Sequence, residues 1–262
     1  MSQASIILLI VFSACSVPSD GMLSESDDNF YIVTSPDNHC RRELTADEPC
    51  LTLQQYAYDP SLGPNASVSL TVESGTHYLQ GVGVIFDSES DFGVPASDFN
   101  MTGESARVVY DAFRVHYYSP ILSIRNARRV AIRGVTFVSN NRGFVRIDRV
   151  QHLLLEHCRF QGVRLYITNV MFDNWAMISM SSFSNYSHWG YGSHNSDHNH
   201  GTISISNSLA YIIQSNFSAN RGAVRYHDHK IDNAKSDPGA LVIYQCIFQS
   251  TRRRPEVHMF AY

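Results

Sequence analysis

Apolar and polar residues alternate in short segments that recur along the chain, each ending near a phenylalanine. The anchoring phenylalanines are Phe137, Phe160, Phe183, Phe217 and Phe248. Five positions before each anchor the residue is aliphatic, namely Ile132, Leu155, Ile178, Ile212 and Ile243. Seven positions before it the residue is again apolar, namely Val130, Leu153, Ala176, Ala210 and Leu241. A period of two over such short stretches predicts β-strands separated by turns.

The anchors recur at intervals of 23, 23, 34 and 31 residues, which suits one turn of a parallel β-solenoid. Each turn of such a fold stacks on the last at roughly 4.8 Å, so equivalent residues lie above one another. A second alternating pair precedes four of the anchors, namely Leu122/Ile124, Val145/Ile147, Leu165/Ile167 and Ile203/Ile205. The two long intervals predict insertions at the same turn of the repeat, residues 186–201 and 223–238.

The pattern V-x-I-x-x-V-x-F-x-x-N of residues 130–140 resembles the right-handed parallel β-helix repeat of the pectin-lyase-like family. The segment from Cys40 to Leu53 ends in Pro-Cys-Leu-Thr-Leu and precedes Gly-Thr-His-Tyr-Leu at 75–79, as in large extracellular β-helix proteins of simple animals. The resemblance covers roughly residues 30–250. It implies an all-β, single-stranded, right-handed parallel β-helix, and the handedness rests on the resemblance alone.

The remaining segments suggest how the chain is organised. Thr52 and Gln55 form a capping box for a short helix from Leu53 to Tyr58, which is expected to cover the open N-terminal end of the solenoid. We expect a signal peptide at 1–16, an N-terminal extension and cap at 17–66, a β-helix of at least six turns at 67–250 and a tail at 251–262. The tail carries no evident cap, which favours a fragment of a longer array.

The N-terminus predicts secretion. Residues 5–14 form an apolar run too short to span a bilayer, and small residues follow it, as expected for a signal peptide cleaved somewhere after Ala14. No other apolar run is long enough for a membrane span. Sequons for N-glycosylation stand at Asn65, Asn100, Asn185 and Asn216.

Four cysteines remain after removal of a signal peptide. Cys40 and Cys50 close a short loop and are expected to form a disulfide in an oxidising compartment. Cys158 and Cys246 occupy the same repeat position, two residues before an anchor, but lie three turns apart, roughly 14 Å at the strand spacing. A disulfide cannot bridge that distance, so we expect two free, buried thiols.

Charge is distributed unevenly. The net charge of −4 does not suggest a nucleic-acid-binding protein, yet residues 125–164 hold nine arginines and only two acids. If these arginines lie on adjacent turns, they form one basic surface that suits an anionic glycan, because guanidinium groups bind carboxylate and sulfate in a bidentate manner. The residues most expected to bind glycan are Arg125, Arg128, Arg129, Arg146 and Arg149. The alternative is a solvated face that balances the acidic N-terminal third.

One ion pair within the arginine-rich segment is expected to be structural. Arg133 and Glu156 both stand four residues before their anchors, so they should meet across adjacent turns.

Catalytic chemistry is less well supported. The available carboxylates, Asp148, Glu156 and Asp173, fall at different positions of the repeat, whereas glycoside cleavage requires carboxylates that flank the same bond. We therefore predict no catalytic residue and no cofactor.

Two other groups of residues are candidate sites. His198, His200, His227 and His229 would supply imidazoles to Zn²⁺ if the two insertions lie side by side, although polar loops of this kind are usually only loops. Trp175, Tyr186, Trp189 and Tyr191 either stack on sugar rings or hold the first insertion in place.

Together these features predict a secreted, non-enzymatic module for extracellular recognition, adhesion or matrix structure. Its expected partner is an extracellular glycan or protein, and neither nucleic acid nor a membrane span is expected. The alternative is a polysaccharide lyase or glycoside hydrolase of pectin-lyase-like fold.

The register of the repeat can be tested at Ile178. If this side chain points inward, Ile178→Asp buries an unpaired charge and should abolish folding. Thermal unfolding followed by circular dichroism should then show no cooperative transition. A soluble variant that unfolds cooperatively would contradict the register.

Overall fold

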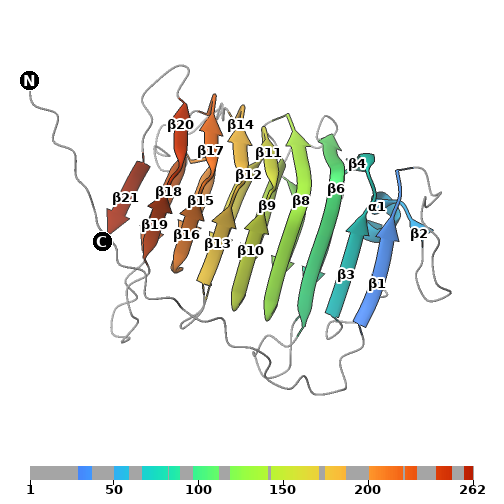
Figure 1. Cartoon of the computed structure of the whole chain (residues 1–262). Coiled ribbons are helices and arrows are strands. Elements are labelled where there is room, and N and C mark those ends of the chain that lie inside the picture. The colour runs from blue at the N-terminus through green and yellow to red at the C-terminus, as the bar shows by residue number, and fades with distance from the viewer. Residues whose placement is uncertain are drawn as a thin grey trace, which may run out of the picture.

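The computed structural model describes residues 29–36, 50–58, 67–81, 83–88, 97–111, 119–140, 143–170, 175–186, 201–220, 222–228, 240–249 and 257–261. This part of the chain is almost entirely β-structure and its strands form two parallel sheets of 14 and seven strands (Figure 1). One short helix, α1 (Leu53–Tyr58), is described beside them.

The 14-stranded sheet consists of two ladders that share the long strands β6 (Asp98–Asp111) and β8 (Arg129–Ser139). Ladder 1 contains the first halves of these strands together with β1 (Asn29–Thr34), β3 (Ser67–Val72), β10 (His152–Glu156), β13 (Trp175–Ser179), β16 (Ala210–Ile213) and β19 (Leu241–Tyr244). Ladder 2 contains their second halves together with β4 (Gly75–Gln80), β11 (Arg159–Gln161), β14 (Ser182–Ser184), β17 (Asn216–Ser218) and β20 (Ile247–Gln249).

The seven-stranded sheet is ladder 3. It consists of β5 (Val84–Asp87), β7 (Ser119–Arg125), β9 (Gly143–Asp148), β12 (Arg164–Thr168), β15 (Ile203–Ser206), β18 (Val224–Asp228) and β21 (Val257–Ala261). The chain visits ladders 1, 2 and 3 in turn and then returns to ladder 1. Each strand therefore pairs with its equivalents in the preceding and following repeats.

The register predicted from the phenylalanine anchors is confirmed. Phe137, Phe160, Phe183, Phe217 and Phe248 are paired in sequence, with ring centroids 4.8–5.4 Å apart and planes within 20° of parallel. The aliphatic column that includes Ile132, Leu155 and Ile178 is likewise in register and fully buried. Identical side chains therefore stack along the interior, which makes it one continuous apolar core.

Single residues with left-handed backbone turn the chain at most of the described corners between ladders. In three columns of such residues φ lies between 47° and 71°. The first corner, between ladders 1 and 2, has Ser105, Gly134, His157, Met180, Gln214 and Gln245. The second, between ladders 2 and 3, has Gly162, Asn185 and Ala219, and the third, between ladders 3 and 1, has Asn126, Arg149, Asn169 and Asn207. Asparagine at the third corner is consistent with its tolerance of this conformation.

The two insertions do not share a turn, so that prediction is wrong. The first lies between β14 and β15, at the second corner. The second lies between β18 and β19, at the third corner, because residues 224–228 form β18 and pair with β15. The sequence pattern does not separate the two turns, because no aliphatic pair marks ladder 3 after Ile203 and Ile205.

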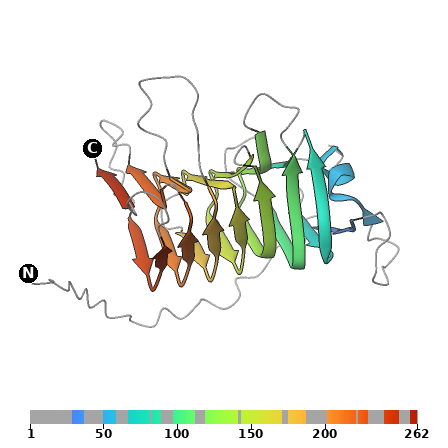
Figure 2. The ribbon, with the colours of Figure 1, turned by 90° about the horizontal axis from the view of Figure 1, so that it is seen from above.

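The parallel array extends beyond residues 67–250 at both ends. β1 pairs in register with β3 and also with the short strand β2 (Cys50–Leu51), and β21 pairs with β18. The capping box is confirmed, since the Thr52 amide donates to Gln55 Oε1 (2.8 Å) and the Gln55 amide donates to Thr52 Oγ1 (3.1 Å). α1 lies at the N-terminal end of the stack (Figure 2) and buries Leu53 and Tyr56. No helix within the described ranges is long and apolar enough to cross a membrane.

The close packing of the first corner predicts a large difference between two glycine substitutions. A Cβ at Gly134 would lie 2.3 Å from the carbonyl oxygen of Gly103, whereas a Cβ at Gly81 would meet no atom within 4 Å. Both glycines have positive φ, so both Ala variants lose about 1 kcal/mol through the left-handed backbone. Gly134→Ala should lose about 1–3 kcal/mol more through overpacking. Urea unfolding of the two variants measures the difference, and equal losses would contradict it.

Candidate functional site

The five arginines expected to bind glycan lie around the third corner of two adjacent repeats. Arg125 ends β7 and Arg146 lies on β9, Arg149 is the left-handed corner residue, and Arg128 and Arg129 lead into β8. The structure thus brings these arginines together as expected.

Carboxylates also lie at this corner and engage three of the five. Arg128 forms a bidentate pair with Asp98, at 2.8 and 3.0 Å. The buried carboxylate of Asp148 lies 3.6 Å from Arg146 and 3.7 Å from Arg149, and it accepts hydrogen bonds from Thr168 (2.6 Å) and Asn169 (3.1 Å). The third corner is therefore a mixed-charge surface held by contacts within the chain.

The other arginines of residues 125–164 lie elsewhere. Arg133 pairs with Glu156 at 3.2 Å, which confirms the predicted ion pair across adjacent repeats. Arg164 is only 5% exposed and its guanidinium lies 4.4 Å from the centre of the Tyr166 ring. Arg159 lies on ladder 2, and Arg142 falls outside the described residues. The expectation of a single basic surface is therefore wrong, because the chain distributes these side chains over three ladders and the interior.

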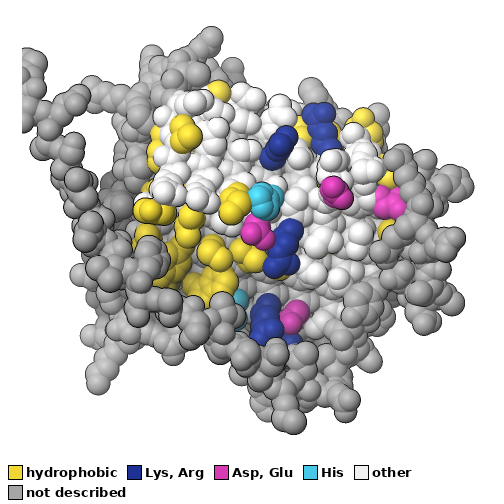
Figure 3. All heavy atoms as spheres, viewed as in Figure 1, with side chains coloured by type: hydrophobic (Ala, Val, Ile, Leu, Met, Phe, Trp, Pro, Cys, Tyr) yellow, Lys and Arg dark blue, Asp and Glu magenta, His cyan; other side chains and the backbone are white. Residues whose placement is uncertain are grey.

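A hollowed surface lies along the outer side of the first corner. Two adjoining hollows of about 770 and 820 Å³ share Ser105, Gly134 and His157 and form one groove across β3, β6, β8, β11 and β14. The first hollow is also lined by Thr71, Val72, Glu73, Ser74, Thr102, Gly103, Glu104 and Arg133. The second is also lined by Arg107, Thr136, Arg159, Gln161, Ser182 and Ser184. On the face formed by ladders 1 and 2, charged side chains are scattered, and hydrophobic side chains gather toward the C-terminal end of the stack (Figure 3).

Charge changes sign along this groove. Glu73 and Glu104 lie in the first hollow, where Arg133 is already paired with Glu156. The second hollow contains Arg107 and Arg159, both exposed, whose side chains make no hydrogen bond or ion pair to any residue that the structure describes. These two guanidinium groups are therefore free to bind an anion from solution.

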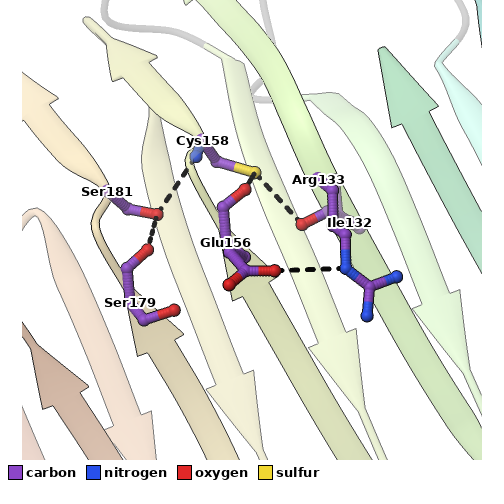
Figure 4. Close-up of polar contacts among 6 residues, drawn as sticks. All are labelled: Ile132, Arg133, Glu156, Cys158, Ser179 and Ser181. Carbon is purple, nitrogen blue, oxygen red and sulfur yellow. Dashed lines mark hydrogen bonds and ion pairs between the residues drawn. The ribbon is translucent and has the colours of Figure 1, made fainter. Parts of the chain in front are cut away.

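On the inner side of the same corner, short serine and cysteine side chains form hydrogen bonds with the backbone (Figure 4). The hydroxyl of Ser181 donates to the carbonyl of Ser179 (2.9 Å), around the left-handed residue Met180, and accepts from the amide of Cys158 (3.1 Å). The thiol of Cys158 donates to the carbonyls of Glu156 (3.4 Å) and Ile132 (3.3 Å). Each of these left-handed residues is thus fixed by the side chain that follows it.

The same arrangement recurs in the later repeats, and two earlier repeats lack it. Ser215 and Cys246 donate to the carbonyls two residues before them, around Gln214 and Gln245. In the repeat where the corner residue is Gly134, the following residue is Val135, which has no side-chain donor. Glycine adopts positive φ without steric cost, so the corner at Gly134 does not need such a hydrogen bond. The corner at Ser105 is followed by Ala106 and also lacks it, although its residue is not glycine.

The two cysteines of this column form no disulfide. Cys158 is buried as predicted, and burial raises the pKa of its thiol to about 11. Cys246 is only half-buried, contrary to expectation, because it lies in the last described repeat of ladders 1 and 2.

Sequence reasoning missed the groove residues Glu73, Glu104 and Arg107. Arg107 occupies the repeat position of Thr136 and Arg159, but its own repeat has Val108 where the others have phenylalanine. That repeat also has three residues between Thr102 and Ala106 where the next has only Gly134, which shifts the register. A search for the alternation alone, without the phenylalanine, would have found it.

Several predicted residues fall wholly or partly outside the described part of the chain. The signal peptide at 1–16, Cys40, Asn65, Asp173, Trp189, Tyr191, His198, His200 and His229 lie outside it, and only the backbone of Cys50 and His227 is described. The shared turn that was expected to bring the histidine loops together does not exist. Among the described residues, no three His, Cys, Asp or Glu side chains are grouped to hold a metal.

The remaining predicted residues have clear positions. Asn185 and Asn216 are exposed, whereas Asn100 is half-buried on β6 and its Oδ1 is buried without a hydrogen bond from the described residues. Tyr186 is buried, and Trp175 packs against His152 with ring centres 5.6 Å apart. Of the aromatic group, Tyr186 therefore serves to hold the chain in place.

Comparison with known proteins gives no further guide. No family model matches the chain, and no match was found among curated proteins or solved structures.

The hydrogen bonds of the first corner predict a rescue between two neighbouring residues. Ser181→Val leaves the buried Cys158 amide without its partner and should cost about 1–3 kcal/mol. In a Met180→Gly background the cost should be smaller, because glycine adopts the left-handed conformation without the bond from Ser181 to the Ser179 carbonyl, and only the loss at the Cys158 amide remains. A double-mutant cycle of urea unfolding measures the coupling. Strictly additive losses would contradict this account.

Proposed function

We propose that this chain is a right-handed parallel β-helix and acts as a secreted, non-enzymatic recognition module that binds an extended anionic glycan. The β-helix proposal is supported by three in-register parallel ladders visited in a fixed order and by the left-handed residues at their corners. The proposal of secretion is supported by the apolar N-terminal run and the sequons, two of which carry exposed asparagines.

The observation that carries the binding proposal is the groove along the first corner. It crosses five strands, hydroxyl, amide and charged side chains line it, and two arginines without a side-chain partner in the described part of the chain lie in its second hollow. A linear polymer suits such a groove better than a compact ligand, because its repeated units meet repeated side chains. Hydroxyl and amide groups of Thr136, Gln161, Ser182 and Ser184 are donors and acceptors for sugar hydroxyls.

Recognition without cleavage is supported by the contacts of the predicted carboxylates. Asp148 is buried and holds four neighbours, and Glu156 is paired with Arg133. Both groups therefore have structural partners. The alternative of a lyase or hydrolase remains an outcome of the experiment below.

The third corner is the second candidate surface for the same ligand class. Arg129 is exposed there and Arg125 is half-exposed, and neither has an ion pair within 4 Å in the described part of the chain. Because Asp98 and Asp148 neutralise their neighbours, we expect this corner to contribute less than the groove.

Binding of the secreted protein to neutral, uronate-containing and sulfated polysaccharides at two salt concentrations tests the proposal. We expect binding to the anionic polymers, weakened by salt, with the polymers remaining intact. The double variant Arg107→Ala/Arg159→Ala should bind the anionic polymers at least about 10-fold more weakly, since each charge-assisted contact contributes about 1.5–3 kcal/mol.

The matched control is Arg128→Ala/Arg129→Ala/Arg146→Ala, which removes charge at the third corner. The groove proposal predicts only a small effect of this variant, and a larger loss here than in the groove variant would assign binding to the third corner. Shortened polymers would support the enzyme alternative. No binding and no shortening would overturn glycan recognition.

A further inference from the structure

From β4 to β14, the outward side chains at one position of ladder 2 alternate between hydroxyl and guanidinium groups from one strand to the next. The register places Thr76 on β4 beside Arg107 on β6, Thr136 on β8, Arg159 on β11 and Ser182 on β14. Adjacent strands in a sheet are about 4.8 Å apart, so the two arginines are roughly 10 Å apart along the stack.

An extended sugar residue in a linear polysaccharide is about as long as the gap between neighbouring strands. A polymer that runs along the stack therefore places one sugar over each strand. The first and third of three successive sugars then lie over Arg107 and Arg159, and the second lies over the hydroxyl of Thr136.

We propose that the groove selects a linear polysaccharide in which an anionic sugar alternates with a neutral one. The carboxylate or sulfate of every second sugar pairs with Arg107 and Arg159, and the neutral sugars contact Thr136 and Ser182. This inference rests on the proposed glycan-binding function and specifies the charge pattern of the glycan that the groove recognises.

The surroundings of the two arginines favour this pattern. Arg107 and Arg159 have no partner within the described part of the chain, so binding an anion breaks no ion pair there. Glu104 lies in the adjoining hollow, where it repels additional negative charge. A polymer with a charge on every sugar would bring more negative charge into the groove than Arg107 and Arg159 can neutralise.

Oligosaccharides of uronate alternating with N-acetylhexosamine test the spacing by isothermal titration calorimetry. A disaccharide carries one carboxylate and reaches one arginine, whereas a tetrasaccharide carries two and reaches both. We expect the tetrasaccharide to bind at least about 10-fold more tightly. Arg107→Ala and Arg159→Ala should each remove this gain while leaving disaccharide binding nearly unchanged.

Two control variants make the test specific. Arg129→Ala removes an exposed arginine from ladder 1 and should leave the gain from chain length unchanged. Thr136→Arg places a charge on every strand from β6 to β11, and should shift preference toward a homopolymeric uronate of the same length. Circular dichroism of each variant confirms that it is folded.

The outcomes separate this inference from the function on which it rests. A gain from chain length that survives in both Arg→Ala variants, or a homopolymeric uronate that binds the unmodified protein more tightly than the alternating one, would overturn the spacing. Absence of binding to every oligosaccharide and to the polymers would overturn the glycan-binding function itself.

Discussion

In-register parallel stacking is the constraint on which the rest of this structure depends. Because each strand pairs with its equivalent in the next repeat, every side chain lies above and below residues at the same repeat position. An inward position must therefore be apolar in successive repeats, or polar with a hydrogen bond, since a single unpaired polar group would be enclosed by its own column. The stacked phenylalanines are an apolar column of this kind. Cys158, Ser181 and Ser215 form a polar column whose members are joined by hydrogen bonds.

The same constraint produces the groove. A left-handed residue in six successive repeats bends the chain at one place, so the bends align into a continuous line along the stack. On the inner side, Ser181, Ser215 and Cys158 fix the bend through hydrogen bonds to the preceding carbonyls. On the outer side, the bend leaves the two adjoining hollows, and outward residues are free to vary because they face solvent. A requirement of the fold thus supplies the surface on which recognition chemistry is placed.

Much of the fold was predictable because stacking converts spatial neighbours into sequence periodicity. The phenylalanine anchors gave the correct register over ladders 1 and 2, and the Arg133–Glu156 pair followed from equal distances to the anchor. Prediction failed where a repeat departs from the consensus. The repeat of β6 has Val108 and two additional corner residues, and β18 has Val224 and Tyr226 where earlier repeats have two aliphatic residues.

The sequence by itself determined the strand period, the inward columns, the N-terminal capping box and one ion pair across repeats. These features depend on residues whose separation along the chain is local or periodic. Only the tertiary structure decided which arginines are free. Arg128 and Arg146 have nearby carboxylates and Arg164 is buried, whereas Arg107 and Arg159 line a groove without a partner among the described residues. That distinction depends on how the corners turn the chain in space, and the charge of a side chain alone carries no information about its partner.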